Sequence, residues 1–65
     1  MRSYEEVIQR ASVNMYYNYM DGGEARYGIM DSDVIAFIFD VSEEQVRNDA
    51  YAAYHEMLNG ERSLI

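Results

Sequence analysis

The chain of 65 residues contains no cysteine and no proline. The absence of cysteine excludes a disulfide framework, a thiol nucleophile and a zinc site built on a Cys/His cluster. No apolar stretch approaches the ~18 residues of a membrane span, and Glu5 and Glu6 occupy the place where a signal peptide would begin its apolar run. We therefore expect a soluble cytoplasmic domain. Its 49% hydrophobic residues must form the core without disulfide bonds or a structural zinc ion.

Lysine is absent as well, so the five basic residues are all arginines, against twelve acidic residues and a formal net charge of −7. A surface of this sign repels DNA, RNA and anionic lipid, so we expect neither a nucleic acid nor a membrane as a direct partner. The charge is concentrated between Asp21 and Asp49, where eight acidic residues face only Arg26 and Arg47. One interpretation is that the charge serves solubility alone, and the other is that the chain presents an acidic face.

A capping box, Ser3-Tyr4-Glu5-Glu6, predicts the start of a first helix. Apolar residues at helical spacing follow, and Asp21-Gly22-Gly23 predicts its end, because glycine accepts the left-handed conformation that terminates helices. The span Tyr16–Tyr19 is also compatible with a short strand, which remains an alternative. Residues 24–30 are expected to connect the first helix to the second.

Asp31 or Ser32 is expected to cap a short second helix, with Asp33 in its first turn, where a negative charge suits the helix dipole. The run Val34–Phe39 that follows is apolar on every side. Such a run forms either the central helix of a core or a buried strand, and the capping residues favour the helix.

A third helix has a second capping box, from Ser42 to Gln45, and Val41 and Val46 occupy the two positions of a hydrophobic staple. Asn59-Gly60 predicts its end. Together these patterns predict a single all-α domain over residues 1–65, a small three-helix domain. Its expected core consists of Val7, Ile8, Ala11, Met15, Ile35, Phe39, Val46, Ala53, Tyr54 and Met57.

The second and third expected helices carry a motif, Ile35-Ala36, Val41-Ser42 and Val46, that resembles the helix-turn-helix pattern of bacterial and phage regulators. The resemblance covers about residues 33–54 and departs from the pattern at Asp40, where the family has glycine in the turn. The family reads DNA through the early residues of its second helix, and here these include Glu43 and Glu44. Two glutamates there would repel phosphates, so we interpret the motif as a packing unit rather than a DNA reader.

Residues suited to catalysis are scarce. His55 is the only histidine, no serine lies in a G-x-S-x-G turn, and Gly22-Gly23 is not followed by the GK[ST] of a phosphate-binding loop. We expect no enzymatic activity, no metal and no cofactor.

Seven tyrosines are the other strong feature of the chain. Tyr4, Tyr19 and Tyr54 fall on the expected core stripes, whereas the other four need not be buried. Tyrosine combines apolar area with a hydroxyl group and is enriched at protein interfaces. Acidic residues beside aromatic ones suit a groove that is rich in arginine and lysine.

In its length, its acidity and its lack of lysine, the chain resembles the small anti-CRISPR proteins encoded by phages. Within that group it looks most like inhibitors of type I multisubunit surveillance complexes, with type I-C as one candidate. The resemblance implies an anti-defence protein in the cytoplasm of a bacterial host that blocks a nucleic-acid-binding surface of a Cas subunit by DNA mimicry. We expect a monomer or a weak homodimer. The expected partner-binding residues are Asp21, Glu24, Asp31, Asp33, Asp40, Glu43, Glu44, Asp49, Tyr16, Tyr17, Tyr27 and Tyr51.

Two alternatives remain open. One is a phage or prophage transcription regulator that dimerises and uses its helix-turn-helix. The other is an adaptor that binds another protein through its tyrosines.

Overall fold

The computed structural model describes residues 2–23 and 32–65, and these contain three α-helices and no strand. The helices are α1 (Tyr4–Met20), α2 (Ser32–Phe39) and α3 (Glu43–Leu58). The prediction of a small all-α three-helix domain is confirmed. Both strand alternatives are wrong, because Tyr16–Tyr19 continues α1 and Val34–Phe39 belongs to α2.

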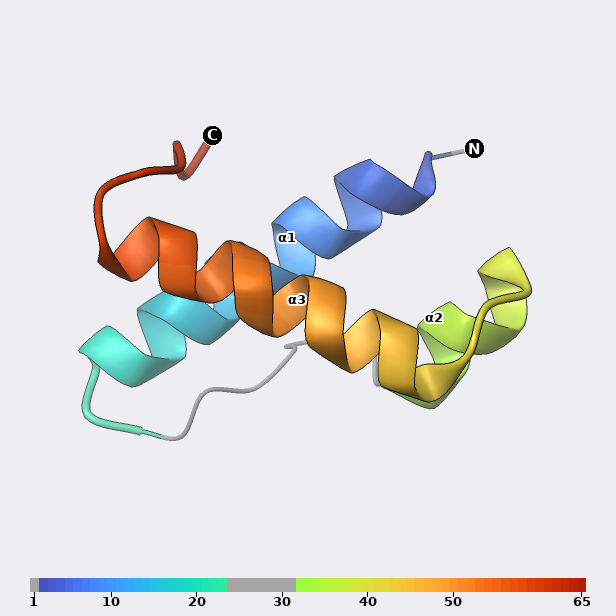
Figure 1. Ribbon diagram of the computed structural model, residues 1–65. Helices are drawn as coiled ribbons and strands as arrows, with labels where there is room; N and C mark the ends of the chain where they lie inside the picture. The colour runs from blue at the N-terminus through green and yellow to red at the C-terminus, as the bar shows by residue number, and fades with distance from the viewer. Residues whose placement is uncertain (1, 24–31) are drawn as a thin grey trace.

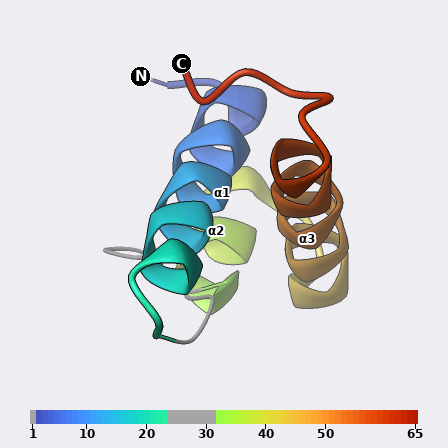
Figure 2. The same cartoon turned by 90° about the vertical axis from the view of Figure 1, so that its left-hand side faces the viewer.

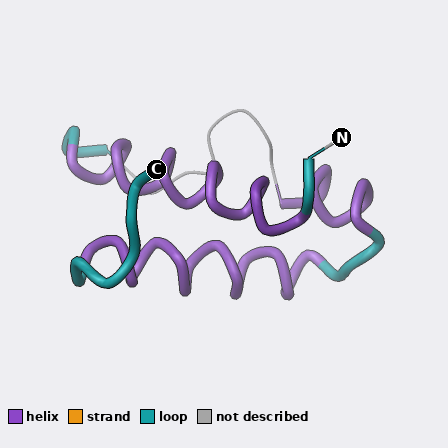
Figure 3. The backbone as a smooth tube through the Cα atoms, turned by 90° about the horizontal axis from the view of Figure 1, so that it is seen from above, coloured by secondary structure: helices purple, strands orange, loops and turns teal. Residues whose placement is uncertain are grey.

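Helix α3 is central to the arrangement, because it packs against both α1 and α2. Helices α1 and α3 run in the same general direction, from the right-hand to the left-hand side of Figure 1, and Figure 3 shows the same from above. The turn between α2 and α3 lies at the right-hand end of the molecule, and the last turns of α1 and α3 lie at the left-hand end (Figure 1). The domain measures 30 × 21 × 20 Å, so these two ends are well separated.

Serine side chains cap the starts of α1 and α3, as the sequence predicts. The Ser3 hydroxyl accepts a hydrogen bond from the Glu6 amide at 3.2 Å, and the Ser42 hydroxyl accepts one from the Gln45 amide at 3.0 Å. Each serine therefore satisfies an amide that has no partner within the helix.

All three helices end in the same way, with one residue in the left-handed conformation. Gly22 (φ +86°) follows α1 and Gly60 (φ +75°) follows α3, which confirms the two predicted glycine stops. At the end of α2 the left-handed residue is Asp40, with φ +55°. The amide of the next residue then bonds back across the last turn, as Val41 does to the Ala36 carbonyl at 3.1 Å.

We predict that Asp40→Gly raises the free energy of unfolding by about 0.5 to 1 kcal/mol. Glycine adopts this conformation without the steric cost that aspartate bears, and the change removes a negative charge from the negative end of the α2 dipole. Urea unfolding followed by circular dichroism measures the effect. Gly60→Asp is the reverse control: a Cβ atom at Gly60 meets nothing within 4 Å, so its cost is that of the backbone conformation. An unchanged or lower stability for Asp40→Gly would contradict the prediction.

The core lies where α1 and α2 meet α3. Eight of the ten predicted core residues are buried, and the other two, Val7 and Phe39, are half-buried and pack against the core. Three further residues are buried, Ser12, Ala36 and Ala50, and all three are small. The Ser12 hydroxyl donates to the Ile8 carbonyl at 2.6 Å, so burial leaves no polar group unsatisfied there.

The connection between α2 and α3 consists of Asp40, Val41 and Ser42. Asp40 takes the left-handed conformation at the position where the helix-turn-helix pattern has glycine, and Ala36 is buried against the core. The likeness of this helix pair to a DNA-reading helix-turn-helix stays a prediction.

Candidate interaction surfaces

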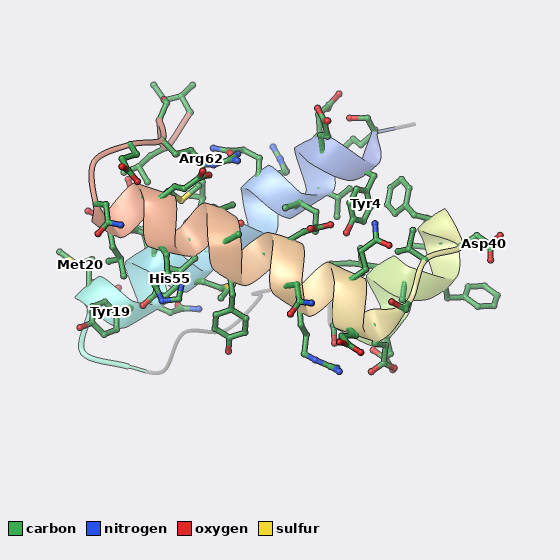
Figure 4. The ribbon with its side chains drawn as sticks, in the orientation of Figure 1. Tyr4, Tyr19, Met20, Asp40, His55 and Arg62 are labelled. Atoms are coloured by element: carbon green, nitrogen blue, oxygen red, sulfur yellow. The ribbon has the colours of Figure 1, made fainter. Side chains whose placement is uncertain are left out.

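A group of exposed carboxylates lies on the turn between α2 and α3, and we call it the acidic turn. It consists of Asp40, Glu43 and Glu44, all exposed. Asp40 lies at the right-hand extreme of Figure 4, and its carboxylate points away from the helices. Glu43 and Glu44 occupy the first turn of α3, where the helix dipole favours negative charge.

One cation lies close to the acidic turn. Arg47 donates to Glu43 at 3.1 Å, one turn further along α3, and both side chains are about half exposed. An exposed pair of this kind contributes only about 0.3 to 0.5 kcal/mol. No ion pair is found for Asp40 or Glu44 within the described residues, so the turn presents a net negative charge to solvent.

The remaining acidic residues predicted as binding residues are dispersed. Asp33 is exposed in the first turn of α2, and Asp21 is exposed after α1, at the other end of the domain from the acidic turn. Asp49 is half-buried and accepts a hydrogen bond of 2.6 Å from the Tyr4 hydroxyl, which ties α1 to α3. Asp49 is thus engaged in the fold.

Three of the predicted binding residues, Glu24, Tyr27 and Asp31, lie outside the described residues.

The outer face of α2 is apolar and exposed, which corrects the expectation that this run is central to the core. Ile35 and Ala36 face inward and are buried, whereas Val34, Phe37 and Ile38 face outward. The Phe37 ring is 88% exposed. A helix that is apolar on all sides is normally buried, so an outer face left open here indicates a surface for contact with another molecule. It lies directly beside the acidic turn, because Asp40 ends the same helix.

The tyrosines expected to bind a partner take up different environments. Tyr16 is half-buried against the core, and Tyr17 and Tyr51 are exposed by 51% and 41%. Tyr19, which the sequence places on the core stripe, is also 51% exposed, because it lies in the last turn of α1 beyond the buried residues.

Three tyrosines and the histidine form a continuous aromatic group, which we call the tyrosine cluster: Tyr19, Tyr51, Tyr54 and His55. The Tyr54 ring is at its centre, with ring centroids 6.1 Å from Tyr19, 6.3 Å from Tyr51 and 5.2 Å from His55. The two tyrosine pairs meet edge to face, the arrangement that aromatic quadrupoles favour. Burial, with smaller effects from Tyr19 and Tyr51, raises the pKa of the Tyr54 phenol, so that group stays neutral at physiological pH.

A groove of about 470 Å³ separates the start of α1 from the second half of α3. Its lining combines apolar and charged side chains, namely Tyr4, Glu5, Ile8, Asp49, Ala52, Ala53, Glu56 and Arg62. Arg62 lines the groove and bonds to both helices, since it donates to Glu56 at 2.7 Å and to the Gln9 amide oxygen at 2.9 Å. The Gln9 amide donates in turn to the Ser63 carbonyl at 2.9 Å, so the C-terminal segment folds back onto α1. Sequence patterns could not reveal the two contacts of Gln9, with Arg62 and with Ser63, because each joins residues more than 50 positions apart.

Within the described residues, no three histidine, aspartate or glutamate side chains are grouped so that they could hold a metal ion. Over the same residues, no helix has the length and apolar character needed to cross a membrane.

Comparisons with known proteins find no matching protein family, curated protein or solved structure.

Proposed function

We propose that this chain is a binding protein that inhibits a partner by occupying its basic nucleic-acid-binding surface through the acidic turn. The observation that carries this proposal is the group of three exposed carboxylates, Asp40, Glu43 and Glu44, beside the open apolar face of α2. Carboxylates on an exposed turn present negative charge to a basic channel much as phosphates do, and such charge accelerates encounter with the channel.

The apolar face supplies what charge alone does not. Exposed charged pairs add little affinity, whereas large aromatic side chains that become buried contribute most of the binding energy at protein interfaces. Phe37 is the most exposed aromatic side chain in the described part of the chain, and it lies three residues before Asp40. We therefore propose that Phe37 anchors the complex and that the acidic turn steers and orients it.

The resemblance to small anti-CRISPR proteins in length and charge supports a Cas subunit of a type I surveillance complex as the partner. Type I-C is the first system to test. The mode of action proposed is mimicry of the DNA that the subunit binds, in the cytoplasm of a bacterial host.

The test is a gel shift with a purified type I-C surveillance complex and its cognate duplex target. We expect prior incubation with this protein to prevent the complex from shifting the DNA, and we expect the protein alone to leave the DNA unshifted. Unimpaired DNA binding by the complex would contradict the proposal for that system. Salt-sensitive binding of duplex DNA by the protein alone would contradict mimicry and favour a helix-turn-helix regulator instead.

A further inference from the structure

We propose that the tyrosine cluster is a self-association surface, on which a second copy of this chain docks through the same face. The inference does not depend on the partner proposed above, because it rests on the opposite end of the molecule. It gives a role to Tyr51, a predicted binding residue that is not part of the acidic turn.

The side chains around the cluster form one surface drawn from two helices. On α3 the residues Tyr51, Tyr54, His55 and Leu58 follow the i, i+3, i+4, i+7 spacing of a single helix face. Tyr19 joins them from the last turn of α1, with its ring 6.1 Å from that of Tyr54, and Met20 follows it in the chain; Figure 4 shows Tyr19, Met20 and His55 at the left-hand end of the molecule. Most of this surface is open, with exposed fractions of 58% for Met20, 51% for Tyr19, 41% for Tyr51 and 38% for Leu58.

The charge distribution favours a second copy at this surface. None of the four α3 residues on the face carries a carboxylate, and on the α1 side one exposed carboxylate, Asp21, directly follows Met20. His55 follows Glu43 by twelve positions on one helix, which places it about 18 Å away along the axis. Because charges in solution are screened over about 8 Å, the acidic turns of two copies docked here would repel each other little.

The other exposed apolar face is poorly suited to self-association. The outer face of α2 lies between Asp33 and Asp40 and beside the acidic turn. Two copies docked through that face would bring like charges together without screening by solvent, which is unfavourable. The two apolar surfaces therefore differ in the partner they fit, a basic protein at α2 and a second copy at the tyrosine cluster.

The size of the surface predicts a weak dimer. The open portions of three aromatic rings, a methionine and a leucine amount to a few hundred Å², below the ~800 Å² that each partner buries in a standard stable complex. We expect a dissociation constant of about 0.1 to 1 mM. Each copy carries a net charge of −7, so rising salt should strengthen the dimer by screening the remaining repulsion.

Sedimentation equilibrium of the purified chain, at rising protein concentration and at low and high sodium chloride, tests the inference. The expected result is a monomer–dimer equilibrium that shifts toward the dimer in high salt. A single species of 7.6 kDa at millimolar concentration in both salts would overturn it.

Two matched variants locate the surface. Tyr51→Glu should weaken the dimer at least tenfold, whereas Phe37→Glu, which makes a similar change in size and charge on α2, should leave it unchanged. Met20→Glu is the second probe of the same surface, since Met20 lies in the last turn of α1 and is 58% exposed. It keeps the test decisive if circular dichroism shows that Tyr51→Glu unfolds. Loss of the dimer in Phe37→Glu would overturn the assignment. So would a dimer that persists unchanged in all three variants.

Discussion

Replacing the three carboxylates of the acidic turn by amides, as Asp40→Asn, Glu43→Gln and Glu44→Gln, is expected to slow association with a basic partner at least tenfold at low salt. Electrostatic steering accelerates association by about 10- to 1,000-fold, and the steering field is strongest where like charges are grouped and exposed. The dissociation rate should change less, because exposed charges act mainly on the encounter and buried aromatic contacts hold the complex together. Surface plasmon resonance against the surveillance complex separates the two rates.

Three other glutamates of the chain provide a control variant with the same net charge. Glu5→Gln, Glu6→Gln and Glu61→Gln also remove three carboxylates. Glu5 and Glu6 occupy the first turn of α1, as Glu43 and Glu44 occupy that of α3. Figures 1 and 2 show that the two helices start at the same end of the domain, α1 at the top and α3 at the bottom.

We expect the control variant to keep nearly the full association rate, and we expect the difference between the two variants to shrink as salt rises. Equal losses in both would mean that only net charge matters and would contradict a specific acidic site. An unchanged association rate in both variants would show that the interface does not depend on these carboxylates. It would favour the adaptor that binds through its tyrosines. Both variants should fold, because amides replace exposed carboxylates and asparagine adopts the left-handed conformation of Asp40 readily.

The helix boundaries could be predicted from the sequence because their causes are local. The hydroxyl groups of Ser3 and Ser42 lie within three residues of the amides that they accept from, and Gly22 and Gly60 end helices through their own backbone freedom. The left-handed conformation of Asp40 was not predicted, since aspartate adopts it only under the demands of the surrounding structure.

The candidate sites depend on which face of each helix the others cover, and here sequence patterns fail. An apolar run such as Val34–Phe39 has no periodicity that distinguishes its inner face from its outer face, so the exposure of Phe37 could not be predicted. The same limit applies to Asp49, whose hydrogen bond with Tyr4 joins residues 45 positions apart. Charge counting placed Asp49 in the acidic segment correctly but could not show that it is engaged in the fold.

The largest effect on stability is expected from Ile35→Ala, which should cost about 2 to 5 kcal/mol. Ile35 is completely buried, and α2 contributes only this side chain and Ala36 to the buried core. A domain of this length is stable by roughly 3 to 10 kcal/mol, so the loss approaches the whole stability of the fold. We expect α2 to detach or the domain to unfold at room temperature.

Ile38→Ala is the matched control for this prediction. It makes the same chemical change in the same helix, one turn further on, but Ile38 is 42% exposed on the outer face. The truncation there creates no closed cavity and should cost less than about 1 kcal/mol. Urea unfolding of both variants, followed by circular dichroism at the helix minimum, measures the difference as a shift in midpoint.

The two outcomes also test how the acidic turn is held. If Ile35 anchors α2, its loss should lower the midpoint strongly and weaken partner binding, because Asp40 is positioned by the end of that helix. Ile38→Ala should leave the midpoint nearly unchanged, and any effect it has on binding would come from the outer face itself. Equal midpoints for the two variants would show that Ile35 does not anchor α2, and the arrangement of α2 against α3 would then have to be revised.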